Sequence, residues 1–289
     1  MRRASLCVLA LAALLGGCSG DPERDERRPA QAEAAPEPPG PTAPVPRAPA
    51  ALAKRLTATD RALAAAVQRW RGDGGLDAYP PPRDVTLHAL HQQRIHLLLT
   101  ARPALAEQVL PLLPGGTRAH ARATIRARRG LGRITPPTPG RYRTGPPEPP
   151  RRLLGYYREA QRRFGVPWHV LAAVNFVESA FGRMRNSSAA GAQGPMQFIP
   201  STWEAYGLGG DVNDPRDAIM GAANYLSASG APGDLVGALY SYNPSDHYVR
   251  AVLAYTDRIR RGEFLSYYSW QVYVRVPGGT RRITGPRPF

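Results

Sequence analysis

The segment from Gly165 to Phe181 constrains the fold of this chain most, because it places a carboxylate on the apolar face of a helix. Gly165 is suited to end one helix, and Pro167 fits the first turn of the next. The residues that share one face of this second helix are Leu171, Val174, Glu178 and Phe181. Burial disfavours the charged form of a carboxylate and raises its pKa, which suits a general acid near neutral pH. A glutamate at the edge of the face that reaches water is the simpler alternative.

Two further motifs follow this helix. Gly194-Pro195-Met196-Gln197 comes after the Glu178-Ser179 pair and a loop of small residues, and Ser241-Tyr242-Asn243 ends a short predicted helix. Together, in this order, they resemble the motifs of the lytic transglycosylases, a family with a lysozyme-like fold. The extension from 197 to 203 is similar to the membrane-bound branch of that family. The resemblance covers residues 153–260, with Ser241 where alanine is usual and Ile199 where many members have methionine.

The resemblance implies cleavage of the β-1,4 bond between N-acetylmuramic acid and N-acetylglucosamine in peptidoglycan, with Glu178 as the catalytic residue. Protonated Glu178 would donate to the bridging oxygen and, once ionised, take the proton of the muramyl C6 hydroxyl as that hydroxyl attacks C1. The product would be a 1,6-anhydromuramyl end. The residues expected to bind the sugar or position the acid are Ser188, Gln197, Tyr225, Tyr242 and Asn243.

The count of carboxylates supports this chemistry, since ordinary glycosidases use two. No second acid belongs to the motifs, and the next one after Glu178 is Glu204. Two alternatives remain open. A hydrolytic muramidase on the same fold would need Glu204 or Asp211 to position water, and a non-catalytic peptidoglycan-binding lipoprotein would need no acid at all.

No cofactor or metal is expected. Three histidines, His88, His91 and His96, could suggest a metal site. Only His88 and His91 share a helical face, and no carboxylate or cysteine completes a site there. The oxygen-bearing residues that could suggest calcium are Asp211, Asn213, Asp214 and Asp217. They lack the spacing of an EF-hand loop, so a turn at Asp214-Pro215 and a helix cap by Asp217 are expected instead.

The first residues indicate export. Arg2 and Arg3 precede an apolar run over 6–15, and Leu15-Gly16-Gly17-Cys18 resembles a bacterial lipobox. We therefore expect a signal peptide over 1–17 and lipidation of Cys18, which would anchor the protein at the outer face of the cell membrane. An ordinary secretory signal is the alternative.

The rest of the chain reads as a mainly α protein. We expect a disordered Pro/Ala-rich linker over 18–50 and a helical accessory segment over 51–134, with helices over 52–70, 85–99 and 103–113 and a fourth that carries an arginine stripe. A Pro-rich linker over 135–150, the catalytic domain over 151–262 and a β-hairpin tail over 263–289 follow, the tail packing on the catalytic domain. The stripe consists of Arg118, Arg122, Arg126 and Arg129.

The chain is strongly basic, with a formal net charge of +16 that comes almost entirely from arginine. A basic exported protein can bind anionic lipid or anionic wall polymers, while the lack of nucleic-acid motifs excludes that class of partner. The charge could also serve only solubility. The expected partners are peptidoglycan strands and the membrane, with anionic wall polymers as candidates. The arginine-rich, lysine-poor composition is typical of a GC-rich genome such as that of an actinobacterium.

Overall fold

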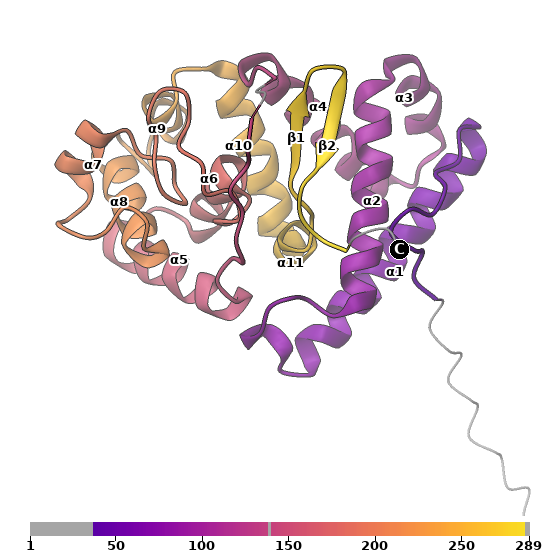
Figure 1. Ribbon diagram of the computed structural model, residues 1–289, viewed down its shortest axis with the longest axis horizontal. Helices are drawn as coiled ribbons and strands as arrows, with labels where there is room; N and C mark the ends of the chain where they lie inside the picture. Colours follow the sequence, from indigo (N-terminus) through magenta and orange to yellow (C-terminus); the bar gives the residue numbers. More distant parts are fainter. Residues whose placement is uncertain (1–36, 138–139, 287–289) are drawn as a thin grey trace, which may run out of the picture. The chain divides into compact units, whose positions relative to one another are not determined.

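The computed structural model describes residues 37–137 and 140–286 (Figure 1). The expected signal peptide, Cys18 and the linker up to residue 36 lie outside the described residues. Among the described residues, no helix is both long and apolar enough to cross a membrane.

The described chain is mainly helical, which confirms the expected fold class. The elements before residue 135 are α1 (Pro49–Gly72), η1 (Gly75–Asp77), α2 (Arg83–Ala101), α3 (Pro103–Val109), η2 (Leu110–Leu112) and α4 (Gly115–Ile134). The later helices are α5 (Pro150–Phe164), α6 (Trp168–Ser179), α7 (Pro200–Tyr206), α8 (Pro215–Ala228), α9 (Leu235–Tyr242), α10 (Asp246–Arg258), the π-helical turn η3 (Ile259–Glu263) and α11 (Phe264–Tyr268). Two short strands, β1 (Tyr273–Val276) and β2 (Gly279–Arg282), end the described chain.

Local caps explain where several helices begin. The Asp234 side chain accepts from the Gly237 N–H and caps the start of α9. For α8 the expected cap was wrong, because Asp214 and not Asp217 occupies the N-cap position. Pro215 is preferred at the first helical position, where it needs no hydrogen bond, so the cap must precede it. Asp217 instead accepts from the Asp211 N–H at 3.0 Å.

One hydrophobic core joins the early and late helices. Side chains of α1, such as Val67 and Trp70, belong to the same buried cluster as Tyr157 of α5 and Trp270 after α11, and α4 packs along α10. A second cluster lies between α1, α2 and the region of α3, and contains Leu56 and Leu99 among others. The boundaries expected at residues 134 and 151 therefore do not separate hydrophobic cores.

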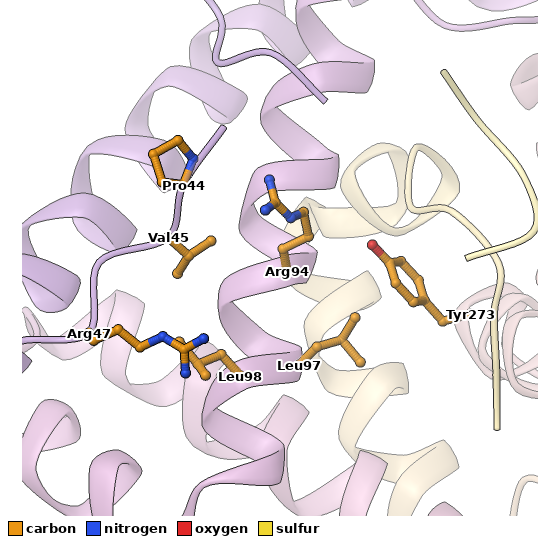
Figure 2. A pocket seen from close by; sticks show the side chains of 7 residues that line it. All are labelled: Pro44, Val45, Arg47, Arg94, Leu97, Leu98 and Tyr273. Carbon is orange, nitrogen blue, oxygen red and sulfur yellow. The ribbon is translucent and has the colours of Figure 1, made fainter. Parts of the chain in front are cut away.

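The last part of the expected disordered linker is ordered. Arg94 of α2 donates through Nη1 to the carbonyls of Pro41 and Ala43, at 3.4 Å and 2.6 Å. Val45 packs on the second core cluster. In Figure 2 this segment lies on one side of α2 and Tyr273 of β1 on the other. Residues from all three line a cavity of about 540 Å³. The linker composition hid this contact because the anchoring arginine and leucines lie far along the chain.

The expected β-hairpin is present, with Tyr273 opposite Arg282 in an antiparallel pair. As expected, its base packs on the catalytic domain, through Trp270 against Phe176 of α6, but it is also held by the earlier helices. Gln93 of α2 donates to the Gln271 carbonyl at 2.8 Å and accepts from the Gln271 N–H, and the Arg275 guanidinium donates to carbonyls at the end of α4. The hairpin therefore runs alongside α2 (Figure 1).

The arginine stripe of α4 is partly a structural device. Arg118 donates to the Leu113 carbonyl at 2.8 Å, and Arg129 donates to the carbonyls of Leu99 and Thr100. These bonds satisfy carbonyls near the ends of neighbouring helices. Only Arg122 and Arg126 of the four are fully exposed.

Candidate active site

Glu178 lies in the last turn of α6, partly exposed, and one of its carboxylate oxygens has a buried partner. The Tyr248 hydroxyl of α10 donates to Glu178 Oε1 at 2.6 Å, and the Tyr248 side chain is 1 % exposed. Burial raises the pKa of Glu178 to about 7, and the bond from Tyr248 acts in the opposite direction. Near neutral pH both protonation states of the Glu178 carboxyl group are therefore populated, which suits a group that donates a proton and later accepts one.

Ser179, the second residue of the Glu-Ser pair, is buried and makes structural hydrogen bonds. Its hydroxyl is buried, donates to the Pro195 carbonyl at 2.5 Å and accepts from the Gly182 N–H at 2.8 Å. Asn175, one turn earlier, donates to the same Pro195 carbonyl at 2.8 Å. The end of α6 is thus tied directly to the Gly-Pro-Met-Gln segment.

The Gly194 to Gln197 segment forms a tight turn that only glycine permits at its first position. Gly194 has φ of +72°, and a Cβ there would lie 1.9 Å from the Val212 carbonyl oxygen. The Gln197 N–H closes the turn on the Gly194 carbonyl at 3.1 Å, and Met196 is fully buried. The Gln197 side chain is half-buried and donates to the Gly194 carbonyl at 3.0 Å. The turn holds Gln197 close to the chain that carries Glu178.

Three tyrosines form a continuous aromatic row from α10 to α8. The rings of Tyr242 and Tyr248 are almost parallel, at 5° and 6.4 Å between centroids, and the Tyr225 ring lies 5.7 Å from that of Tyr242. The Tyr242 hydroxyl donates to the Met196 carbonyl at 2.6 Å, and that of Tyr225 donates to the Ser241 carbonyl at 2.8 Å. Both hydroxyls are therefore committed to the backbone, which leaves partly exposed ring faces for an apolar contact.

The remaining expected binding residues occupy different surroundings. Ser188 is exposed, and its hydroxyl accepts from the N–H groups of Ala190 and Ala192 within its own loop. No contact between Ser188 and Glu178 is found in the described chain. Asn243 follows α9 directly and is half-buried, and its side-chain amide has no hydrogen-bond partner among the described residues. Of these two residues, Asn243 is thus the one whose side chain has a donor and an acceptor that no described residue uses.

Comparison with known proteins agrees with this geometry. Residues 155–262 match the family model described as the transglycosylase SLT domain. The matched segment is 108 of the 289 residues, a little over a third of the chain. The chain is also 33 % identical over 75 residues to the membrane-bound lytic murein transglycosylase F of Thiobacillus denitrificans, a match that covers 26 % of this chain and 16 % of that protein. The chain thus spans about a sixth of that relative's length. No solved structure matches the chain significantly.

This match confirms the expected resemblance to the lytic transglycosylases and the helical fold class that it implied. The SLT domain contains all three motifs, with Glu178, Gln197 and Asn243 inside its bounds. Tyr267 and Trp270, which lie beyond its last residue, pack against Phe176 of the glutamate helix. The helix that carries Glu178 is therefore supported by residues outside the matched segment.

No second carboxylate takes part in the electrostatics of Glu178. Its pKa depends on burial and on Tyr248, and no charged group among the described residues contributes. Glu204 on α7 and Asp211 are both exposed. In the described part of the chain, no three histidine, cysteine or carboxylate side chains are arranged to hold a metal. His96 instead packs against the rings of His120 and Trp270 in the core.

Tyr248 is the site residue that the sequence motifs did not reveal. A signal existed, because Tyr248, Val252, Tyr255 and Ile259 recur at helical spacing on the apolar face of α10. That pattern assigns Tyr248 to the core but cannot say that its hydroxyl meets Glu178, seventy residues earlier. Only the packing of α10 against α6 brings the two together.

Proposed function

We propose that this chain is a lytic transglycosylase that cleaves peptidoglycan glycan strands between N-acetylmuramic acid and N-acetylglucosamine. The observation that carries the proposal is a single partly buried carboxylate with a pKa near 7, inside an SLT domain. A lone group of this pKa is suited to act first as an acid and then as a base in one catalytic cycle.

The proposed reaction uses the substrate as its own nucleophile. Protonated Glu178 donates its proton to the glycosidic oxygen, and the bond from that oxygen to muramyl C1 breaks. The ionised Glu178 then accepts the proton of the muramyl C6 hydroxyl as its oxygen bonds to C1. The cycle returns the acid to its protonated form, consumes no water and leaves a 1,6-anhydromuramyl end. The N-acetyl group of the substrate helps to hold the charge at C1.

We assign the surrounding residues to substrate positioning. The partly exposed faces of Tyr242 and Tyr225 fit the apolar faces of sugar rings, since their hydroxyls are already bonded to the backbone. The free amide of Asn243 suits a sugar hydroxyl or an N-acetyl group. Gln197 suits a contact next to the acid, and Ser188 is proposed as a binding residue on the family resemblance alone.

We propose that the enzyme acts in the cell envelope. The lipobox-like segment ending at Cys18 supports export and lipid anchoring at the outer face of the cell membrane. The high positive charge supports additional contact with anionic wall polymers. The relative from Thiobacillus denitrificans is named as membrane-bound, which agrees with this location.

Mass spectrometry of the sugars released from purified peptidoglycan tests the proposed reaction. We expect anhydromuramyl ends, lighter by one water than reducing ends. The Glu178→Gln variant should lose about 10²–10⁴ in rate because it can neither donate nor accept the proton. Glu204→Gln serves as the matched control and should retain activity, since Glu204 is exposed on α7.

The other outcomes would replace the proposal with a different function. Reducing ends, lost on Glu204→Gln or an equivalent change at Asp211, would identify a hydrolytic muramidase. No new ends from folded protein that still binds the wall would identify a binding lipoprotein.

A further inference from the structure

A cavity of about 420 Å³ lies at the side of the molecule where the start of α2, the end of the hairpin and the loop after α6 meet. Its wall is largely apolar and rich in proline, with Tyr79 and Leu87 beside four prolines. This volume is within the range of small-molecule sites. No carboxylate lines the cavity, whereas two arginines, Arg83 and Arg183, do. The proposed transglycosylase reaction uses none of these residues.

Arg183 is the unusual member of this wall, because it is a fully buried cation without an anion. Its side chain is 1 % exposed, and none of the ion pairs among the described residues involves it. An arginine cannot escape this cost by losing its proton, since its pKa stays above the physiological range. Buried charges in proteins are normally paired.

The protein satisfies the guanidinium only in part. Nη1 donates to the Ala180 carbonyl at 3.0 Å and Nη2 to the Tyr268 carbonyl at 2.6 Å. The rings of Tyr268 and Tyr79 lie 4.7 Å and 5.5 Å from the guanidinium carbon and add cation–π attraction. The Nε–H has no partner among the described residues, although it is buried. One donor on a positive group is thus left without a partner next to an apolar cavity, and because it is buried, a ligand reaches it only when the side chains that cover it move aside.

These features define the ligand chemistry. A single free N–H on a cation suits one oxygen of a monoanion, and does not offer the two-pronged contact that a phosphate dianion would use. The proline and tyrosine walls suit a flat or compact apolar body. We propose that this cavity binds a small carboxylate carried by a compact apolar or aromatic body, with Arg183 as its counter-ion. Arg83 at the exposed rim adds a second positive charge to attract the ligand.

The test uses 4-fluorobenzoate and its neutral analogue 4-fluorobenzamide, titrated into the full chain and followed by ¹⁹F NMR. The two probes have nearly the same shape, so their difference reports the charge. We expect the acid to bind roughly tenfold or more tightly than the amide, as for a hydrogen bond to a charged group. Equal affinity of the two probes, or no binding of either, would overturn the proposal. The difference in affinity between the two probes does not depend on glycan cleavage, so the test remains informative even if the proposed transglycosylase activity is absent.

Two variants locate the binding. Arg183→Met should abolish the preference for the acid, provided that circular dichroism shows a native fold. Tyr79→Ala covers the case in which the buried substitution does not fold, since Tyr79 is 37 % exposed. This substitution removes one wall of the cavity and should weaken the binding of 4-fluorobenzoate about two- to tenfold. Tyr240→Ala, an exposed tyrosine outside the cavity, should bind as the native chain does. Unchanged binding to Tyr79→Ala and Arg183→Met would place the probe elsewhere and refute the assignment.

The chain itself supplies the rival occupant. Gly285 and Pro286 line the cavity, and residues 287–289 follow directly. A double variant with Pro288→Gly and Phe289→Ser removes the apolar groups of this tail. If 4-fluorobenzoate binds this double variant with about the same affinity as it binds the native chain, the cavity serves a separate ligand. Binding that improves tenfold or more would show that the tail fills the cavity, and would overturn the proposal.

Discussion

Replacing Tyr248 by phenylalanine tests how the site sets the pKa of Glu178. The Tyr248 hydroxyl donates to Glu178 Oε1 at 2.6 Å from a buried position. Because it stabilises the ionised carboxylate, it keeps the pKa below the value that burial alone would produce. Phenylalanine preserves the ring and its packing against Tyr242, so the substitution removes only the donor.

The expected shift follows from the strength of such a bond. A hydrogen bond to a charged group contributes about 1.5–3 kcal/mol, which corresponds to about 1–2 pKa units. The pKa of Glu178, about 7 in the native protein, should therefore rise by that amount in the variant. Since the proposed reaction starts from the protonated acid, the pH at which activity falls should rise by the same amount. At pH 5 the rate should drop about three- to tenfold, because the forming carboxylate has lost its donor.

Two measurements check this prediction. A ¹³C NMR titration of protein labelled at the glutamate carboxyls gives the pKa directly, and a pH–rate profile on peptidoglycan gives its catalytic effect. Tyr255→Phe is the matched control, since Tyr255 is buried in the same helix and has no bond to Glu178. A pKa that stays at its native value or falls in Tyr248→Phe would refute the reasoning.

Three further predictions concern stability and can all be measured by urea denaturation. Ser179→Ala leaves the Gly182 N–H without its acceptor and should lower the free energy of unfolding by about 1–2 kcal/mol. Gly194→Ala should cost about 3 kcal/mol or more, because the added Cβ meets a carbonyl oxygen; Gly191→Ala, with a similar φ but open space, should cost clearly less, and equal costs would contradict the steric argument. Burial lowers the pKa of His120 to about 3, so the unfolded chain binds a proton below pH 6.5 that the folded chain does not, and stability is lost as pH falls. From pH 6.5 to pH 4.5 this amounts to about 2–3 kcal/mol, and His120→Gln should flatten the dependence in that window; an unchanged slope would show that other groups cause it.

The local features of the fold could be predicted from the sequence because they depend on neighbouring residues. The glutamate helix is bounded by Gly165 and Pro167, and both act within one turn. The hairpin was expected from alternating residues and a glycine turn, and the structure contains it. Each of these signals is complete within a few residues. The position of an element relative to distant ones has no such signal.

The errors share this origin. The segment around Val45 has the composition of a disordered linker, yet it is held by Arg94, about fifty residues later. The hairpin base packs on Phe176 of the catalytic domain as expected, but its bonds to Gln93 of α2 were not predicted, because a pair of glutamines leaves no pattern in the sequence. Tyr248 carries a correct core periodicity, but its hydroxyl partner lies on another helix. Composition and periodicity report burial, and they do not report which polar atoms meet.

The contacts around the Pro195 turn explain why the three motifs belong together. Ser179 of the first motif donates to the Pro195 carbonyl, and Tyr242 of the third donates to the Met196 carbonyl, so both fix the backbone of the second. The turn in its middle can exist only with Gly194 at its start. Glu178 precedes Ser179 and is therefore held beside this segment, and its second carboxylate oxygen has no hydrogen-bond partner among the described residues. We therefore expect a substitution in any one motif to move the carboxyl group of Glu178 relative to the ring faces of Tyr225 and Tyr242.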